Sequence, residues 1–360
     1  MNKMISNTIK AFRRPSTIPS LDEIPPLRIL AQTVEELRGK LLIPRTVAST
    51  YTLKPLLIQS LKMNGGRFSV SQLERLPSKR EVLGIDSTAI PIAESREGIL
   101  LAARASLIRR TLNEDYGVER VGPILAYITE RTLNELRSEL VASRRIMRLA
   151  PVDPWYSKQI IMTILENWLL WRAVSTSWEA IILVDGSLRP SIIKLRNYPI
   201  QNIIREAERR GNTLIGVSKR SKLFKWCPGK LMKLAEEEPP SAVEVPEAHR
   251  YLKNLLGNVY FALLSKDGMP LRVDVSLYEE TPLQRLNELY SSDYVYRGYP
   301  ETLRRAHVFS KLSKTERIGL RSSLRLFDAR LIPAEKERVL LFGAFCGAAR
   351  DWRAADAHLR

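Results

Sequence analysis

Residues 178–190 read Trp178-Glu179-Ala180-Ile181-Ile182-Leu183-Val184-Asp185-Gly186-Ser187-Leu188-Arg189-Pro190. Five consecutive apolar residues predict a strand that is buried on both faces, and the Asp-Gly pair predicts a turn directly after it. Side chains at the ends of such strands point into the crevice where open α/β sheets bind ligands. Asp185 is therefore a candidate functional carboxylate. The alternative is that Asp185 only begins a turn.

A second segment repeats this plan earlier in the chain. Residues 82–88 read Val-Leu-Gly-Ile-Asp-Ser-Thr, which is a short apolar strand over 82–85, then Asp86, then small hydroxyl residues. Two strands that each end in an aspartate favour the functional interpretation of both carboxylates.

Charge and composition narrow the function classes. The chain has 360 residues, enough for one elaborated domain or two small ones, and its formal net charge is +18. Such a charge attracts polyanions, with nucleic acid as the first candidate and an anionic membrane surface as the second. No apolar run approaches the ~18 residues that a membrane span requires, and the first residues lack the apolar region of a secretory signal. Two cysteines exclude a disulfide framework and a cysteine-based zinc site, so we expect a soluble protein of a reducing, cytoplasmic compartment.

The order of expected elements indicates the fold class. We expect strands over 82–85, 98–108, 118–128, 181–184, 213–217, 259–264 and 271–278. We expect helices over 27–41 (for core packing or dimer formation), around Asn64-Gly65-Gly66, over 132–149, from Asp153 or Ser157 to about Ser175, and over 200–210. Two more begin at Thr281-Pro282 and after Tyr299-Pro300. Residues 236–247 contain three prolines and five glutamates and are expected to form an exposed loop.

Three hairpin-connected strands followed by strands with helical crossovers predict an α/β fold with a mixed sheet flanked by helices. This is the plan of a ribonuclease-H-like core, in which the first and fourth strands are neighbours, so Asp86 and Asp185 should lie close together. We divide the chain into a helical N-terminal region (1–80), a ribonuclease-H-like domain (81–330) and a C-terminal tail (331–360).

Two adjacent carboxylates repel each other by about 4 kcal/mol at ~4 Å and an effective dielectric constant of 20. A divalent cation removes this penalty, and oxygen ligands favour Mn²⁺ or Mg²⁺ over zinc. We nominate Glu166 as a third ligand because it lies on an apolar flank of the helix over 157–175, where a charge needs a partner. A Glu paired with a core arginine is the alternative.

Four segments, in this order, resemble the NurA nucleases of archaea and some bacteria. They are Gly84-Ile-Asp-Ser, Ile182-Leu-Val-Asp-Gly-Ser-Leu, Leu214-Ile-Gly-Val-Ser-Lys-Arg-Ser-Lys, and Gly298-Tyr-Pro followed by Leu303 and Ala306-His307. The resemblance implies a ribonuclease-H-like, manganese-dependent nuclease that degrades single-stranded DNA from the 5′ end and has some endonuclease activity. It also implies a homodimer, the hexameric HerA translocase as partner, and a prokaryotic, archaeal source.

By this resemblance Asp86 and Asp185 are metal ligands, Lys219 is an active-site cation and His307 is a late member of the active site. The family pattern has Asp-Gly-Ser in its first motif, whereas Ser87 directly follows Asp86 here. This departure leaves open a weakened metal site. A surface lysine and a structural histidine are the alternative interpretations of Lys219 and His307.

Hydrolysis of a phosphodiester needs an activated water and positive charge on the leaving oxygen, which two metal ions bridged by carboxylates supply. Asp185 is the expected bridging ligand, with Asp86 and Glu166 completing the shell. His307 is expected either to bind metal or to protonate the leaving group.

A basic segment that contains aromatic residues follows Lys219. Cations track phosphates while aromatic faces stack on unpaired bases, so this segment is a candidate site for single-stranded DNA. Its members are Arg220, Lys222, Phe224, Lys225 and Trp226. Four arginines in the helix expected over 132–149 either add to the same groove or only decorate a helix: Arg137, Arg144, Arg145 and Arg148.

Two other functions stay open beside the metal-dependent DNA nuclease. One is a guide-directed, PIWI-like nuclease, which shares the fold but needs additional domains for binding the guide. The other is a catalytically inactive NurA-like scaffold that only binds DNA and its translocase.

Overall fold

The computed structural model describes residues 25–44, 69–276 and 281–331. The helix expected around Asn64-Gly65-Gly66 and the tail beyond residue 331 lie outside these residues. No helix within the described ranges is long and apolar enough to cross a membrane.

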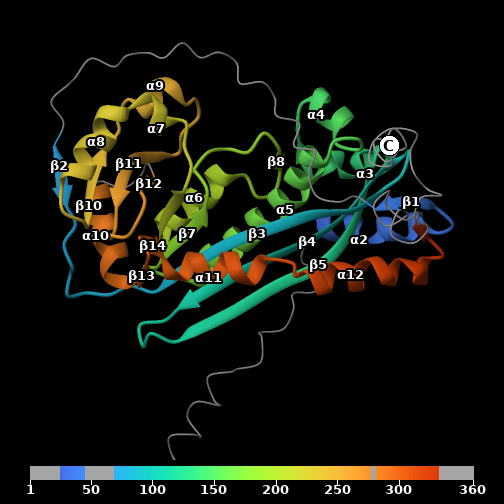
Figure 1. Cartoon of the computed structure of the whole chain (residues 1–360), viewed down its shortest axis with the longest axis horizontal. Helices are drawn as coiled ribbons and strands as arrows, with labels where there is room; N and C mark the ends of the chain where they lie inside the picture. Colours follow the sequence, from blue (N-terminus) through green and yellow to red (C-terminus); the bar gives the residue numbers. More distant parts are fainter. Residues whose placement is uncertain (1–24, 45–68, 277–280, 332–360) are drawn as a thin grey trace, which may run out of the picture.

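A large mixed sheet forms the centre of the molecule (Figure 1). Its first three strands form an antiparallel meander: β3 (Val82–Glu94), β4 (Gly98–Arg110) and β5 (Tyr116–Thr129). β7 (Ile181–Asp185) pairs parallel to β3, and β9 (Thr213–Ser218) pairs parallel to β7. The resulting order β5-β4-β3-β7-β9 is that of a ribonuclease-H-like core, so the predicted fold class and the predicted adjacency of first and fourth strands are confirmed.

Further strands extend both sides of this core. Beyond β9 the sheet continues through β12 (Leu271–Ser276), β11 (Gly257–Leu263), β10 (Ser241–Glu244) and β2 (Val70–Gln72). At the far end of β3 the sheet adds β1 (Leu41–Pro44) and β15 (Arg330–Leu331). Two short pairs lie outside it: β6 (Leu140–Val141) with β8 (Lys194–Leu195), and β13 (Val295–Tyr296) with β14 (Tyr299–Pro300).

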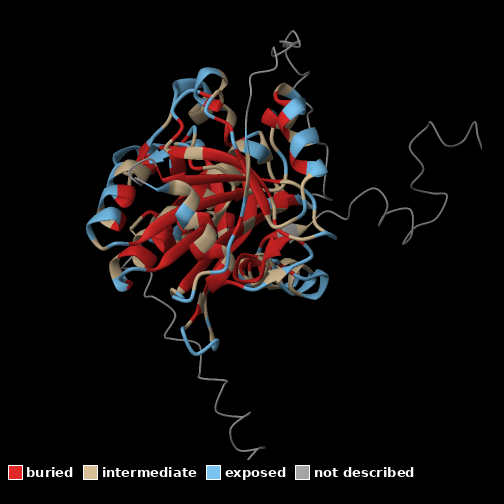
Figure 2. Cartoon of the chain, turned by 90° about the vertical axis from the view of Figure 1, so that its left-hand side faces the viewer, coloured by how far each residue is buried: buried red, intermediate tan, exposed pale blue. Residues whose placement is uncertain are grey.

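Helices cover both faces of the core strands. The buried helix α5 (Pro154–Thr176) packs against β3 and β4 from one side, and α11 (Glu301–Ser310) packs against them from the other. The strands between these layers are buried almost throughout (Figure 2). The remaining helices are α2 (Pro25–Gln32), α3 (Glu130–Glu135), α4 (Arg144–Leu149), α6 (Ile200–Arg209), α7 (Leu223–Trp226), α8 (Pro228–Glu236), α9 (Ala248–Tyr251), α10 (Pro282–Ser292) and α12 (Lys314–Ser323).

The first strand is longer than its apolar start predicts. β3 continues from Ile85 to Glu94 because residues 86–91 pair with β4 without interruption. Asp86 therefore lies within a strand, not at its end. Since side chains alternate across a strand, Gly84, Asp86 and Thr88 face α11, while Ser87 faces α5.

The prediction of a single helix over 132–149 is wrong. α3 ends at Glu135, a 3-10 turn follows over Leu136–Ser138, and β6 precedes α4. Local capping explains the restart, because the Ser143 hydroxyl accepts a hydrogen bond from the backbone N–H of Ile146.

Two other expected elements also differ. The helix expected over 27–41 ends at Gln32, passes through a 3-10 turn and becomes β1 after Gly39, whose φ of +70° favours glycine. Most of its apolar residues, Leu27 and Leu30 among them, are buried in the chain's own core, whereas Leu41 is exposed. This burial favours core packing over dimer formation. The loop expected over 236–247 contains β10, because its Ser-Ala-Val run fits the space between β2 and β11.

Candidate active site

Asp86 lies on the face of β3 that α11 covers, and 7 % of its surface is exposed. Its Oδ2 lies 2.7 Å from His307 Nδ1 and accepts a hydrogen bond of 3.0 Å from the Ser310 hydroxyl. Burial raises the pKa of Asp86, and the nearby Asp185 carboxylate raises it further. The protein thus holds a carboxylate where its charge is unfavourable without a cation.

His307 reaches Asp86 because α11 is fixed directly over β3. The Asp293 carboxylate accepts hydrogen bonds from the backbone N–H (3.0 Å) and hydroxyl (2.8 Å) of Thr302 and so caps the first turn of the helix. The Ser106 hydroxyl of β4 donates to the carbonyl of Ala306 (2.6 Å). The helix position is therefore set by contacts with the sheet that are remote in sequence.

Asp185 is the last residue of β7, the strand that pairs with β3 beside Asp86. Gly186 follows with φ of +141°, and the backbone N–H of Leu188 donates to the buried Asp274 carboxylate (3.0 Å), which fixes the turn. The Asp185 Oδ2 atom is 3.0 Å from Lys219 Nζ and 3.9 Å from His307 Nδ1. Asp185 at the end of β7 therefore contacts one side chain that follows β9 and one side chain of α11.

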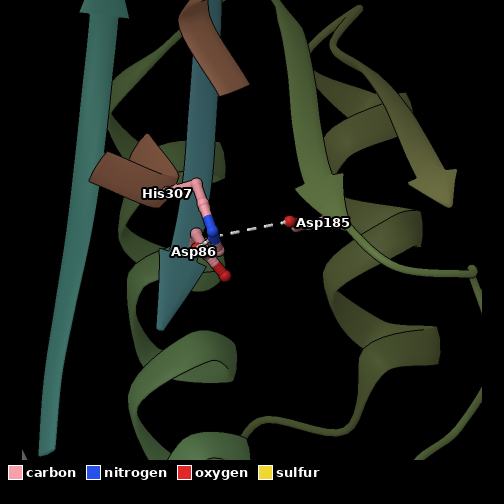
Figure 3. Close-up of side chains that lie close together, drawn as sticks. All are labelled: Asp86, Asp185 and His307. Carbon is pink, nitrogen blue, oxygen red and sulfur yellow. Dashed lines mark hydrogen bonds and ion pairs between the residues drawn. The ribbon is translucent and has the colours of Figure 1, made fainter. Parts of the chain in front are cut away.

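Three side chains from three elements converge in this way (Figure 3). Asp86, Asp185 and His307 each offer one ligand atom, and these atoms all lie within 4.8 Å of one another. Two carboxylates and one imidazole form a donor set that can hold a divalent cation, and such a cation would offset the burial and the Asp185 repulsion that raise the pKa of Asp86. The residues present therefore fit a divalent metal ion.

The structure places Glu166 beside this group and not within it. Glu166 Oε1 accepts a hydrogen bond of 2.6 Å from the Ser87 hydroxyl, on the face of β3 opposite to His307. Burial raises its pKa to about 8, with smaller contributions from Asp86 and Asp185. Glu166 thus contributes a third carboxyl group to the region, and its role as a ligand stays a prediction.

Lys219 is at the end of β9, as its position after a buried strand predicts. In addition to its contact with Asp185, its ammonium group lies 4.4 Å from the centre of the Tyr299 ring. About 39 % of its side chain is exposed. The ammonium group is thus held at the carboxylates and remains accessible to an anionic ligand.

Tyr299 is a site residue to which the sequence analysis gave no role. Its buried hydroxyl lies close enough to the Asp185 carboxylate to interact with it, although it makes no hydrogen bond of good geometry within the described part of the chain. Burial raises its pKa, and the Asp185 and Asp86 carboxylates raise it further, so the hydroxyl stays protonated. The sequence signal that could have identified Tyr299 is its place in the Tyr-Pro pair directly before α11, the helix that carries His307.

The basic segment after Lys219 is only partly available to a ligand. Arg220, Lys222 and Lys225 are exposed. The two aromatic rings are partly buried in the adjoining core, where Phe224 packs edge-on against Phe261 and Trp226 packs against Tyr251. Their expected stacking on bases is therefore limited by contacts within the protein, and the DNA-binding role of the segment stays a prediction.

A cleft of about 550 Å³ opens beside the carboxylates. Asp185 and Glu166 line it, together with the turn over 186–193 and the start of α5. An extended ligand in this cleft would therefore reach Asp185 from the α5 side of the sheet.

Comparisons with known proteins add a family assignment. A protein-family model described as the NurA domain matches residues 80–312, which is more than half of the chain. The crystal structure of the NurA nuclease from Sulfolobus solfataricus is similar at 17 % identity and a TM-score of 0.47, covering 71 % of this chain and 88 % of that one. Another NurA crystal structure aligns at 12 % identity and a TM-score of 0.41, covering 71 % of this chain and 91 % of that one.

An endonuclease V from Bacillus subtilis aligns at 13 % identity and a TM-score of 0.36, covering 72 % of this chain and 88 % of that one. No curated protein matches the sequence at a significant level. The family assignment therefore rests on the family model.

Proposed function

The chain belongs to the NurA family, and from this premise we propose that it is a divalent-metal-dependent nuclease that hydrolyses DNA. The observation that carries the proposal is the convergence of Asp86, Asp185 and His307 from β3, β7 and α11. The net charge of +18 supports a polyanionic substrate.

Asp86, Asp185 and His307 would hold the metal ion, and Glu166, whose carboxyl group lies beside them, is the further ligand that we propose. Carboxylate oxygens suit both Mn²⁺ and Mg²⁺; we propose Mn²⁺ from the family resemblance, with Mg²⁺ as the alternative. The bound ion would supply an activated water and would neutralise charge on the phosphate.

The chain's own residues have separate tasks in this proposal. Lys219 is accessible and cationic, so it binds oxygens of the substrate phosphate that lies beside Asp185. If His307 does not bind the metal ion through Nδ1, it holds a proton at that atom, where it contacts Asp86, and delivers it to the leaving group. The Tyr299 hydroxyl, which stays protonated and lacks a well-formed hydrogen bond among the described residues, donates to an oxygen of the substrate.

The finer properties come from the family resemblance. We propose that the enzyme degrades single-stranded DNA in the 5′ to 3′ direction with some endonuclease activity. We also propose that it acts as a homodimer with a HerA-type hexameric translocase in processing DNA ends. Arg220, Lys222 and Lys225 would contribute charge to DNA binding. Phe224 and Trp226 would hold this segment in place by packing against the adjoining core.

A labelled single strand tests the proposed function. The protein is incubated with 5′-labelled or 3′-labelled DNA in Mn²⁺, in Mg²⁺ or in a chelator. We expect cleavage only with a divalent ion, and mononucleotide release from the 5′ label first. Binding without cleavage under all conditions would instead identify a DNA-binding scaffold.

Lys219 offers a test of the electrostatics of the site. In the Lys219→Gln variant we expect about fivefold tighter Mn²⁺ binding, because removing the ammonium group frees Asp185 of a contact of about 1 kcal/mol. We also expect about tenfold slower cleavage at saturating Mn²⁺, because a partly exposed cation at the phosphate is lost. Calorimetric titration and initial rates measure the two effects.

The matched control for this variant is Lys266→Gln, an exposed lysine in the β11–β12 hairpin that is paired with Glu238. It should change neither quantity. Parallel loss of metal binding and of cleavage in the Lys219→Gln variant would refute the assigned role of the ammonium group.

A further inference from the structure

A second cleft, of about 1150 Å³, lies just beyond the N-terminal end of α5 and is rich in arginine. It is formed by the β3–β4 turn, α3, β6, α4 and the residue that follows β8. Seven cationic side chains line it against three carboxylates. Two of these cations have acidic partners, since Lys40 pairs with Glu97 and Arg131 pairs with Glu135.

The other cations of this cleft are exposed and have no carboxylate partner among the residues that the structure describes. They are Arg96, Arg137, Arg144, Arg148 and Arg196. Arg144 and Arg148 are four residues apart on α4 and repel each other across one helix face. A concave surface in which cations outnumber carboxylates, and in which five arginines have no carboxylate partner among the described residues, attracts a polyanion.

This second cleft, called the arginine cleft below, adjoins the 550 Å³ cleft at Asp185 and Glu166, called the catalytic cleft below, at two places. The turn between α4 and α5 contributes Val152 to the arginine cleft, and the first turn of α5 contributes Trp155 to the catalytic cleft. Strand β8 and the residue after it contribute Lys194 to the catalytic cleft and Arg196 to the arginine cleft. One extended ligand can therefore occupy both clefts.

Trp155 marks the junction. It lies in the first turn of α5, where the Asp153 carboxylate accepts a hydrogen bond of 2.8 Å from its backbone N–H, and 48 % of its surface is exposed. An exposed indole in a cleft presents a flat face on which an unpaired base stacks. Glu166 lies eleven positions further along α5, which is about 16 Å along a helix, so several nucleotides fit between the two residues.

We propose that Trp155 and the arginine cleft bind the single-stranded polynucleotide whose phosphodiester lies at Asp185. Trp155 stacks on a base where the strand leaves the catalytic cleft, and the arginines bind its phosphates beyond that point. The inference rests on the proposed nuclease function, which it extends by assigning the path of the strand.

Binding measured in a chelator tests the arginines without involving the metal site. The probe is a fluorescent oligothymidylate of about 16 nucleotides, with one of about 4 nucleotides as the short probe. With the long probe, the Arg144→Gln/Arg148→Gln variant should show a weaker salt dependence. The magnitude of the negative slope of log affinity against log salt should fall by about 0.7 for each lost phosphate contact. The short probe should be unaffected because the catalytic cleft alone holds it.

Arg145→Gln is the matched control, since this exposed arginine lies on the same helix but does not line the cleft. It should leave the slope unchanged. Arg196→Gln on the far wall gives a second, independent variant if α4 is perturbed, and urea unfolding checks the fold of each protein. An unchanged slope in both cleft variants, or an equal fall in the control, overturns the assignment.

The stacking residue is tested with Trp155→Ala. We expect about tenfold weaker binding of the long probe, and no change for Trp178→Ala, a tryptophan that is 67 % exposed and lies outside both clefts. Equal losses for a blunt duplex would overturn the choice of an unpaired strand.

Cleavage in Mn²⁺ separates the two proposals. If the wild-type protein never cuts DNA but the slopes change as expected, the nuclease function fails and the binding path stands. If it cuts DNA and the slopes do not change, only the binding path fails.

Discussion

Replacement of Asp185 by asparagine is expected to slow DNA cleavage by about 10³-fold, equivalent to about 4 kcal/mol of transition-state stabilisation. The amide keeps the size of the side chain but removes the charge that lies 3.0 Å from Lys219 Nζ and 3.9 Å from His307 Nδ1. Without that charge, one of two carboxylates in the candidate metal set is lost, and Lys219 loses the partner that holds it in place. Initial rates on a labelled single strand at saturating Mn²⁺ measure the effect.

Asp267→Asn is the control, because this carboxylate is exposed in the β11–β12 hairpin and lies away from the metal set. It should cut DNA at the wild-type rate. Both variants should bind DNA as the wild type does when a chelator is present, so that the loss is assigned to chemistry. An Asp185→Asn variant that cuts within tenfold of the wild-type rate would remove Asp185 from the active site.

The order of elements was sufficient to predict the relation between Asp86 and Asp185. Hairpin-connected strands must be antiparallel neighbours, and a helical crossover returns the chain parallel to an existing strand. β3 and β7 do pair in this way, with Ile85 opposite Val184. Asp86 and Asp185 are the next residue on each strand. This part of the site therefore follows from local patterns together with a small number of topological rules.

The contributions of the helices could not be derived in the same way. A residue's place on an apolar helix does not determine which face of the sheet it reaches, and Glu166 contacts Ser87 while His307 contacts the preceding residue, Asp86, from the opposite side. Similarly, the aromatic residues Phe224 and Trp226 pack on Phe261 and Tyr251, which are remote in sequence. Such choices depend on tertiary packing, for which a single sequence carries no periodic signal.

Gly84 shows how closely the site depends on that packing. An added Cβ at Gly84 would lie 2.8 Å from the carbonyl oxygen of Thr302, 2.9 Å from its carbonyl carbon and 3.0 Å from the backbone nitrogen of Leu303. All three are backbone atoms of α11, so no side chain can rotate to make room. The motif that precedes Asp86 thus requires glycine because α11 lies against β3 at that point.

We expect Gly84→Ala to lower the free energy of unfolding by about 1–3 kcal/mol, the usual cost of overpacking. We also expect it to slow cleavage by about 10²-fold under conditions where the protein remains folded, because a displacement of about 1 Å moves His307 away from Asp86. Urea unfolding and initial rates measure the two effects.

Gly117→Ala in β5 is the control, since the nearest atoms to its added Cβ are 3.8 Å and 3.9 Å away on Arg109. Its stability and activity should match the wild type or improve slightly, because alanine restricts the unfolded chain more than glycine does. If Gly84→Ala were as stable and as active as Gly117→Ala, the close contact of α11 with β3 would not exist in solution. His307 would then not be fixed at Asp86, and the three-residue metal set would lose one of its members.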